Sequence, residues 1–163
     1  VDILLAFPGL LLIFALAAFL PASIVNVILI FSLVGWTGFC RVARAQVLSE
    51  KEKEFVQAAT SLGIKTPMLL IKHIIPNIIA PLMVQATFAM GGIIIGESSL
   101  SFLGIGVPPD TPSWGNMLFA AKQSGFQPAF VAIFPGLAIM TTVLGFNFIG
   151  DGLRDVWDPK LKH

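Results

Sequence analysis

The stretch that decides the fold covers residues 3–40 and reads ILLAFPGLLLIFALAAFLPASIVNVILIFSLVGWTGFC. Its 38 residues include no charged side chain, and one helical crossing of a bilayer needs about 20 apolar residues. Pro21 disfavours a helix interior, and Ser23 can cap a helix that begins directly after it. We therefore expect two membrane-spanning helices, over residues 3–20 and 24–40.

Two further stretches without charge follow, at residues 74–96 and 123–150. Around them we expect a third span over residues 74–99 and a fourth over residues 128–150. The chain is 56% hydrophobic and only 12% charged, whereas soluble domains carry about 25% charged residues. Helices satisfy their own backbone hydrogen bonds in lipid, and the sequence shows no alternating barrel pattern. The predicted fold class is therefore an all-α, polytopic transmembrane helix bundle.

The basic residues indicate which ends of the spans face the cytoplasm. Of ten Lys and Arg residues, six lie in residues 41–73 and three in residues 151–163, and Lys122 lies between the third and fourth spans. Lys and Arg are enriched in cytoplasmic segments of membrane proteins. We therefore expect a cytoplasmic loop at residues 41–73, a cytoplasmic tail at residues 151–163 and an external loop at residues 100–127.

The expected cytoplasmic loop has the pattern of two short helices. Ser49 and Glu52 fit a capping box, in which the serine caps the helix and the glutamate bonds back to the serine backbone. An apolar face with helical spacing follows, formed by Phe55, Ala58, Ala59 and Leu62. Gly63 then stands where a helix often ends in a left-handed residue.

A second short helix is expected to begin with Thr66 as N-cap and Pro67 at its first position, and to lead into the third span. The result is a helix–Gly–helix elbow. Such an elbow can lie on the lipid surface, pack under its own bundle or dock into a partner protein. Three glutamates within residues 50–54 repel an anionic lipid surface, which makes simple lipid anchoring the less attractive use.

Three blocks of the sequence carry a family resemblance, and the first is the elbow. It contains QAA at residues 57–59, then Gly63, then HIIPN at residues 73–77. This block resembles the EAA loop of binding-protein-dependent importer permeases, in which Glu-Ala-Ala is followed by a glycine and a hydrophobic-Pro-Asn close. Gln57 stands where the family pattern has glutamate, so this position keeps its hydrogen-bonding capacity and loses its charge.

The other two blocks narrow the resemblance. One is GESSLSFLGIG at residues 96–106 followed by PSWGNM at residues 112–117, and the other is GDGLRDVWDP at residues 150–159. Both are similar to the dipeptide, oligopeptide and nickel permeases. The resemblance implies a permease subunit with six spans, of which four are visible here and two would precede Val1. It implies an ATP-binding-cassette importer that carries di- or oligopeptides across the bacterial inner membrane, with nickel or another small solute as the alternative cargo.

The resemblance also implies partners: cytoplasmic ATPase subunits, a second homologous permease, an external solute-binding protein and membrane lipid. The elbow would be the coupling helix, seated in a groove of an ATPase subunit. The chain has no glycine-rich phosphate-binding loop ending in Lys-Ser or Lys-Thr. We therefore expect it to catalyse nothing and bind no cofactor itself, with ATP and Mg²⁺ held by the partner subunits. The residues implied in ATPase coupling are Gln57, Ala58, Ala59, Gly63, His73, Pro76 and Asn77.

Glu97 is the only acid inside an expected apolar span. Acids within spans are commonly functional, so Glu97 and Ser98 are candidates for the substrate path. Ser98, Ser99 and Ser101 nearby allow solvation or a structural hydrogen bond instead, and for Glu97 the structural role is the preferred interpretation. The chain has only two histidines, His73 and the terminal His163, so we expect no metal site. A net charge of +1 indicates neither nucleic acid nor an acidic ligand as a partner.

Other classes of membrane protein remain as alternatives to the importer. A channel would show a ring residue or filter repeat in its spans, and a lipid-modifying enzyme would show a polar cluster near the interface; neither pattern is evident. A structural scaffold would not need an ordered elbow with small residues. An importer permease is therefore the preferred interpretation.

Overall fold

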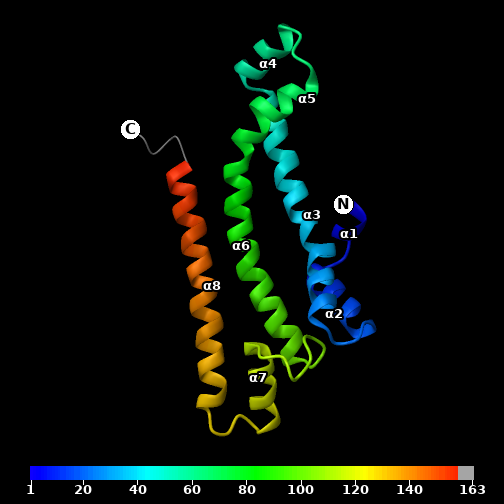
Figure 1. Ribbon diagram of the computed structural model, residues 1–163, viewed down its shortest axis with the longest axis vertical. Coiled ribbons are helices and arrows are strands. Elements are labelled where there is room, and N and C mark those ends of the chain that lie inside the picture. The colour runs from blue at the N-terminus through cyan, green and yellow to red at the C-terminus, as the bar shows by residue number, and fades with distance from the viewer. Residues whose placement is uncertain (158–163) are drawn as a thin grey trace.

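The computed structural model describes residues 1–157, and this part of the chain is helical without a strand. In chain order the helices are α1 (Asp2–Leu5), α2 (Gly9–Phe19), α3 (Ile24–Lys51), α4 (Glu54–Ser61), α5 (Thr66–Leu69), the π-helical turn η1 (Leu70–Ile74), α6 (Ile75–Phe102), α7 (Trp114–Gln123) and α8 (Phe130–Trp157). Long helices run along the molecule, with α4 and α5 at one end, α7 at the other, and α1 and α2 beside α3 (Figure 1).

Three helices are long and apolar enough to cross a bilayer. The first is α3 and the third is α8. The second is the continuous helix Thr66–Phe102, which consists of α5, η1 and α6. Each has at least 28 residues, which at about 1.5 Å per residue exceeds a hydrocarbon core of about 30 Å. Figure 1 shows α6 between α3 and α8, with which it packs. The predicted fold class, an all-α transmembrane bundle, is confirmed.

The N-terminal run differs from the single helix expected over residues 3–20. It forms α1 and α2, with a break that ends at Pro8, the residue directly before α2. Proline lacks an N–H and its ring clashes with the preceding helical turn, so a helix that approaches it from the N-terminal side ends. The 11 residues of α2 reach only about 16 Å. A crossing at this position would need both helices and the break between them.

The junction between α3 and α4 also differs from expectation. α3 continues past residue 40 to Lys51, because residues 41–51 contain neither Gly nor Pro to end it. Ser49 consequently lies inside α3, Glu52 is its C-cap and the capping box is not formed. Glu50 is instead buried and pairs with the Nζ atom of Lys53. Residues 41–51 therefore continue α3, and the bounds of the expected cytoplasmic loop over residues 41–73 remain a prediction.

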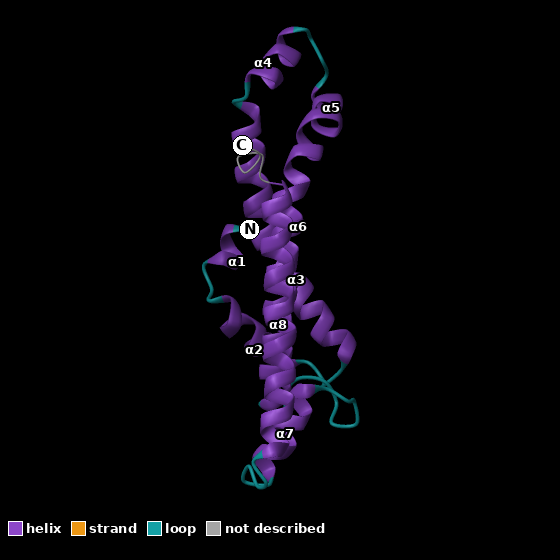
Figure 2. Cartoon of the chain, turned by 90° about the vertical axis from the view of Figure 1, so that its left-hand side faces the viewer, coloured by secondary structure: helices purple, strands orange, loops and turns teal. Residues whose placement is uncertain are grey.

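The segments that connect the long helices lie at the two opposite ends of the molecule. The segment α4–η1, called the elbow below, lies at the same end as the C-terminus of α8 (Figure 1). α7 and the turn before α3 lie at the other end. Figure 2 shows α4 and α5 as an arch beyond the long helices. The assignment of the elbow end to the cytoplasm remains a prediction, and the expected tail residues 158–163, with Lys160 and Lys162, lie outside the described residues.

The segment at the opposite end, residues 103–127, contains a helix that was not predicted within the expected external loop. α7 begins where the Oγ atom of Ser113 accepts a hydrogen bond from the Asn116 N–H at 3.1 Å, a helix cap. The Nδ2 atom of Asn116 donates to the carbonyl oxygens of Pro108 and Thr111 at 2.9 and 2.8 Å. We call residues 103–127 the cap.

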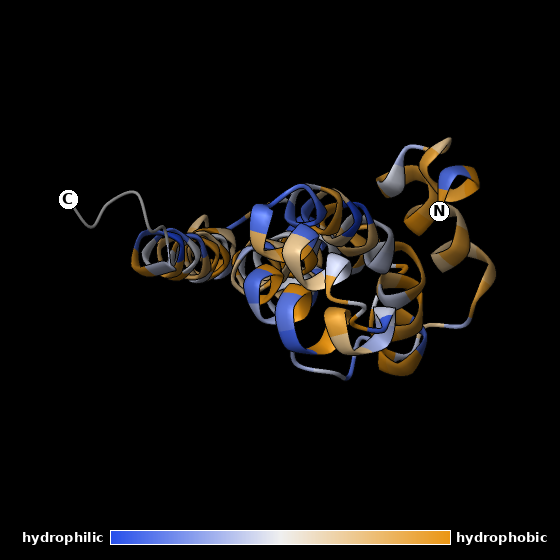
Figure 3. Cartoon of the chain, turned by 90° about the horizontal axis from the view of Figure 1, so that it is seen from above, coloured by the Kyte–Doolittle hydropathy of each residue, from blue (hydrophilic) through white to orange (hydrophobic). Residues whose placement is uncertain are grey.

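The long helices approach one another closely at glycines. A Cβ atom at Gly96 would lie 2.7 Å from ring atoms of Phe31, so α3 and α6 meet where Gly96 lacks a side chain. A Cβ at Gly91 would lie 3.3 Å from the side chain of Val143 on α8. The helices near the N-terminus are coloured mainly as hydrophobic (Figure 3). Such a composition is expected for helices that face lipid.

Candidate functional site

The elbow turns at Gly63. Its N–H donates to the carbonyl of Thr60 at 3.0 Å, and the next N–H, of Ile64, donates to the carbonyl of Ala59 at 3.2 Å, which is a Schellman motif. Gly63 has φ of 77°, a left-handed conformation that costs other residues about 1–2 kcal/mol. The expected left-handed glycine at this position is confirmed.

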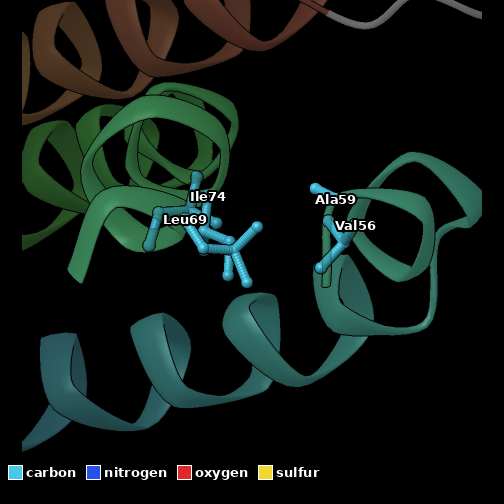
Figure 4. Packing of buried hydrophobic residues seen from close by; sticks show 5 residues of the cluster. Val56, Ala59, Leu69 and Ile74 are labelled. Atoms are coloured by element: carbon cyan, nitrogen blue, oxygen red, sulfur yellow. The ribbon is translucent and has the colours of Figure 1, made fainter. Parts of the chain in front are cut away.

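The elbow has a hydrophobic core of its own. Val56 and Ala59 on α4 face Leu69 and Ile74 across the turn (Figure 4), and Ile78 at the start of α6 completes the cluster. All five side chains are at most 7% exposed. Burial of these side chains, rather than hydrogen bonds between the two arms, holds the elbow closed.

The sequence predicted an apolar face on α4 without saying which way it turns, and the structure directs most of it outward. Ala59 is buried, but Phe55 is 43% exposed, Leu62 is 83% exposed and Ala58 is also exposed. Val56, which the sequence reasoning did not select, is 2% exposed and takes the inner position. The helix is thus rotated so that Val56 and Ala59 face inward, while Phe55, Ala58 and Leu62 face outward.

The second arm of the elbow, α5 and η1, begins one residue earlier than predicted. Lys65 is the N-cap of α5, so Thr66 is the first helical residue rather than the cap. The π-helical turn that follows lets the Ile75 N–H reach the Leu70 carbonyl, five residues back. This wider turn brings Leu69 and Ile74, five residues apart, into the same core. In a regular α-helix, residues five apart do not share a face, so α-helical spacing would not have placed Leu69 and Ile74 in one core.

The implied coupling residues occupy different environments. Gln57 is exposed, and its Nε2 atom donates to the Glu52 carbonyl at 3.0 Å. The Nδ2 atom of Asn77 donates to the His73 carbonyl at 2.6 Å. The ring of His73 lies 6.4 Å from that of Phe55, centroid to centroid.

Pro76 is exposed in the first turn of α6, and Ala59 alone among the implied residues belongs to the elbow core. The elbow therefore presents Gln57, Ala58 and Pro76 to its surroundings and keeps Ala59 inside.

A second candidate site lies where α3, α6 and the cap meet. A groove of about 640 Å³ is lined mainly by apolar side chains, among them Phe31, Trp36 and Val107. Within residues 1–157, Glu97 is the one charged residue that lines it. A second groove, of about 500 Å³, also has Glu97 in its wall. Glu97 thus stands where two apolar grooves adjoin, and we call the larger one the Glu97 groove.

The carboxylate of Glu97 is oriented by two serines. The Ser101 hydroxyl donates to Oε1 at 2.7 Å and itself accepts from the Val107 N–H at 3.3 Å. The Ser98 hydroxyl lies 3.5 Å from Oε2, at the long limit of a hydrogen bond. Ser98 is 5% exposed and does not line the Glu97 groove. The structure therefore separates the two expected path residues: Glu97 lines the groove and Ser98 lies behind it.

The cap rests directly on these serines. A Cβ atom at Gly115, in the first turn of α7, would lie 2.6 Å from Cβ of Ser101 and 2.8 Å from Cα of Ser98. Ser101, one of the serines expected to offer Glu97 a structural hydrogen bond, thus joins Glu97 to the cap. Its position four residues after Glu97, one helical turn away, was the available signal.

The charged and metal-binding groups of the described residues are sparse. Within residues 1–157, no three His, Cys, Asp or Glu side chains gather in a way that could hold a metal ion. The ion pair that the described residues form joins Glu50 and Lys53, at the start of the elbow. Oε2 of Glu50 is buried and has no hydrogen-bond partner within the same residues.

Comparison with known proteins agrees with the architecture. The chain is 44% identical over 161 residues to the dipeptide transport system permease protein of Alkalihalophilus pseudofirmus. It is equally 44% identical over 161 residues to the glutathione transport system permease proteins of Escherichia coli and Shigella flexneri. Each alignment covers 99% of this chain and 53% of the relative. The chain thus spans about half the length of the curated relatives it matches.

The family comparison covers the whole chain. The model described as "Binding-protein-dependent transport system inner membrane component" matches residues 1–163. That match includes the elbow, the cap and all three long helices. The chain therefore belongs to the family of inner membrane components of binding-protein-dependent transport systems, the permeases of ATP-binding-cassette importers.

Proposed function

We propose that the full-length protein containing this chain is a permease subunit that carries peptides across the bacterial inner membrane. Family membership supports the role of permease. The relatives are named for the transport of dipeptides and of glutathione, and both cargoes are short peptides. The proposed partners are a second homologous permease, an external solute-binding protein and cytoplasmic ATPase subunits. The ATPase subunits bind the ATP and Mg²⁺, and this chain converts their movement into movement of its helices.

The observation that carries the proposal is an exposed apolar surface on the elbow, which we call the elbow face. It consists of Phe55, Leu62, Met68 and Ile71, which are 43, 83, 59 and 68% exposed. Several large apolar side chains exposed on one short segment are typical of a protein–protein contact. A short helix that offers such residues fits the mode in which a helix lies in a partner's groove.

The way the elbow is built favours this use. Its core holds the two arms together from inside, so the elbow face does not depend on a partner for its shape. Ala58 lies beside this face with a small side chain, which permits close approach of another backbone. Gln57 is neutral and bonded to the Glu52 carbonyl. We therefore propose that the elbow docks on the ATPase subunit mainly by apolar burial, without an ion pair at residue 57.

The test is binding of the ATPase subunits to the detergent-solubilised full-length protein. Leu62→Asp places a charge in the elbow face without removing a buried contact, and Gly63→Asp distorts the turn. Gly125→Asp is the matched control, because Gly125 also has positive φ, 66°, and open space around its Cβ position, but lies in the cap.

We expect both elbow variants to weaken binding by roughly tenfold or more, the effect of losing an interface hot spot. The control should bind like the wild type. Wild-type binding that is unchanged in Leu62→Asp and Gly63→Asp would remove the elbow from the interface. A wild type that does not bind the ATPase subunits would overturn the importer function itself.

A further inference from the structure

The described part of the chain offers the carboxyl group of Glu97 no cationic partner. Within residues 1–157 no basic side chain lies within ion-pair distance of its carboxylate. Lys122, the basic residue of the cap, lies instead over the ring of Phe102, 5.2 Å from its centroid. The hydroxyl groups of Ser98 and Ser101 are neutral donors. They orient the carboxylate without neutralising it.

The surroundings of Glu97 make the lack of a cationic partner within residues 1–157 costly. Glu97 is half-buried at the wall of two grooves whose other lining residues are apolar or neutral. A carboxylate removed from water is disfavoured unless it is paired with a cation. Acids at membrane depth accordingly face a cavity or pathway and pair with a partner there. A cation from outside the described residues would complete this site.

The chemistry of the site selects among cations. A divalent transition metal needs several ligands, commonly imidazole or thiolate, and Glu97 has no companion of those types within residues 1–157. An ammonium group needs only oxygen acceptors. Oε2 is the less occupied oxygen, because its single serine neighbour stands at 3.5 Å. The site therefore fits a primary ammonium group better than a metal ion.

The groove around the carboxylate fits a small molecule with apolar parts. Its volume of about 640 Å³ lies within the usual range of about 300–1,000 Å³ for small-molecule sites. Phe31 and Trp36 offer aromatic surface along α3, and Trp114 offers more in the adjoining groove. A carboxylate beside apolar walls matches the amino end of a short peptide, which joins an ammonium group to a side chain.

We propose that Glu97 binds the N-terminal ammonium group of the peptide during its passage along the Glu97 groove. This inference rests on the proposed peptide-importer function and names the group of the cargo that the chain recognises. Ser101 is a positioning residue in this site, since it holds Oε1 at 2.7 Å and is itself anchored by the Val107 N–H of the cap.

The test uses the complete importer in liposomes of phosphatidylcholine and phosphatidylglycerol, whose headgroups carry no primary amine. Uptake of a radiolabelled dipeptide and of its N-acetylated form is measured with each at a concentration that saturates the binding protein. The variants are Glu97→Gln, which removes the charge, and Glu97→Asp, which keeps it. Asp110→Asn is the matched control, because Asp110 is an exposed acid of the cap that does not line the groove.

We expect Glu97→Gln to lower uptake of the free dipeptide about tenfold and uptake of the N-acetylated form by less than twofold. Glu97→Asp should retain most of the preference for the free amine, and Asp110→Asn should match the wild type. For Ser101, the positioning role predicts a partial loss of the same preference in Ser101→Ala.

Three results would overturn the inference. Uptake of both peptides by Glu97→Gln at the wild-type level would show that the carboxylate has no part in transport. Equal losses for the two peptides would assign it a structural role. Loss of the second permease from purified Glu97→Gln complexes would show that a basic side chain of that subunit is the cation. Failure of the wild-type importer to take up any peptide would instead overturn the proposed function, and this inference with it.

Discussion

The elbow and the cap are both short helical segments attached to opposite ends of α6, yet they are held in different ways. The elbow closes around five buried apolar side chains and exposes a set of large ones. The cap closes by close contact at Gly115, by the hydrogen bonds that Asn116 donates to two carbonyls of the cap, and by the hydrogen bond that Ser101 accepts from the Val107 N–H. The elbow is built to present a surface, whereas the cap is built to fix a geometry around Glu97.

The largest expected effect concerns the elbow core. Ile74→Ala should lower the free energy of unfolding by about 2–5 kcal/mol, because a fully buried side chain leaves a cavity; Ile74 is 1% exposed. Ile71→Ala is the matched control at 68% exposure, with an expected change within about 0.5 kcal/mol. Denaturation of the solubilised full-length protein measures both. Equal effects would show that the elbow does not depend on its core.

The next effect concerns the cap. Gly115→Ala should destabilise by about 1–3 kcal/mol, because the added Cβ meets Ser101 and Ser98 at 2.6–2.8 Å. Gly92→Ala on α6 is the control, since nothing lies within 4 Å of a Cβ there and alanine is the better helix former. Thermal melting of both variants tests this contrast. A Gly115→Ala protein as stable as the wild type would show that the cap yields and does not fix the position of Glu97.

A smaller effect is expected at the turn of the elbow. Gly63→Ala should cost about 1–2 kcal/mol from its left-handed backbone alone, because its Cβ position is open. Gly63→Asn should cost less, since asparagine tolerates this conformation. Stability measurements on the two variants separate backbone strain from crowding. If asparagine were as harmful as alanine, the strain explanation would fail.

The smallest effect concerns Gln57. Its side-chain amide donates to the Glu52 carbonyl, an exposed bond worth about 0.5 kcal/mol. Gln57→Ala and Gln57→Glu should both lose that amount, since an ionised glutamate cannot donate. Differential scanning calorimetry of the two variants measures this loss of stability. Wild-type stability in Gln57→Glu alone would mean that residue 57 contributes as an acceptor instead.

Much of the fold could be predicted because its signals are local. Charge-free blocks indicated the three long helices, and Gly63 indicated the turn of the elbow, since both depend on the properties of neighbouring residues in the chain. The break before Pro8 was missed although proline is also a local signal. The long charge-free run predicted one helix over residues 3–20 despite this proline. The end of α3 was missed because a helix continues until a residue that disfavours helix, such as Gly or Pro, stops it, and residues 41–51 contain neither.

The candidate sites were predicted less completely, because they depend on facing surfaces. The spacing of Phe55, Ala58, Ala59 and Leu62 correctly indicated an amphipathic helix but not which side turns inward. A π-helical turn set that side by bringing Ile74 beneath α4. Glu97 could be selected from the sequence as an isolated acid. Its groove could not, since its walls come from α3, α6 and the cap together.

By itself, the sequence determined that this protein is a helical membrane bundle with an elbow that turns at a glycine, and it carried the family motifs. These properties follow from hydrophobic length, charge placement and backbone freedom, each set within a few turns of chain. Only the tertiary structure decided which elbow residues are buried, that the cap rests on Ser98 and Ser101, and that Glu97 lines an apolar groove. Burial and close contact are relations between segments distant in the chain, so they emerge only when the helices pack.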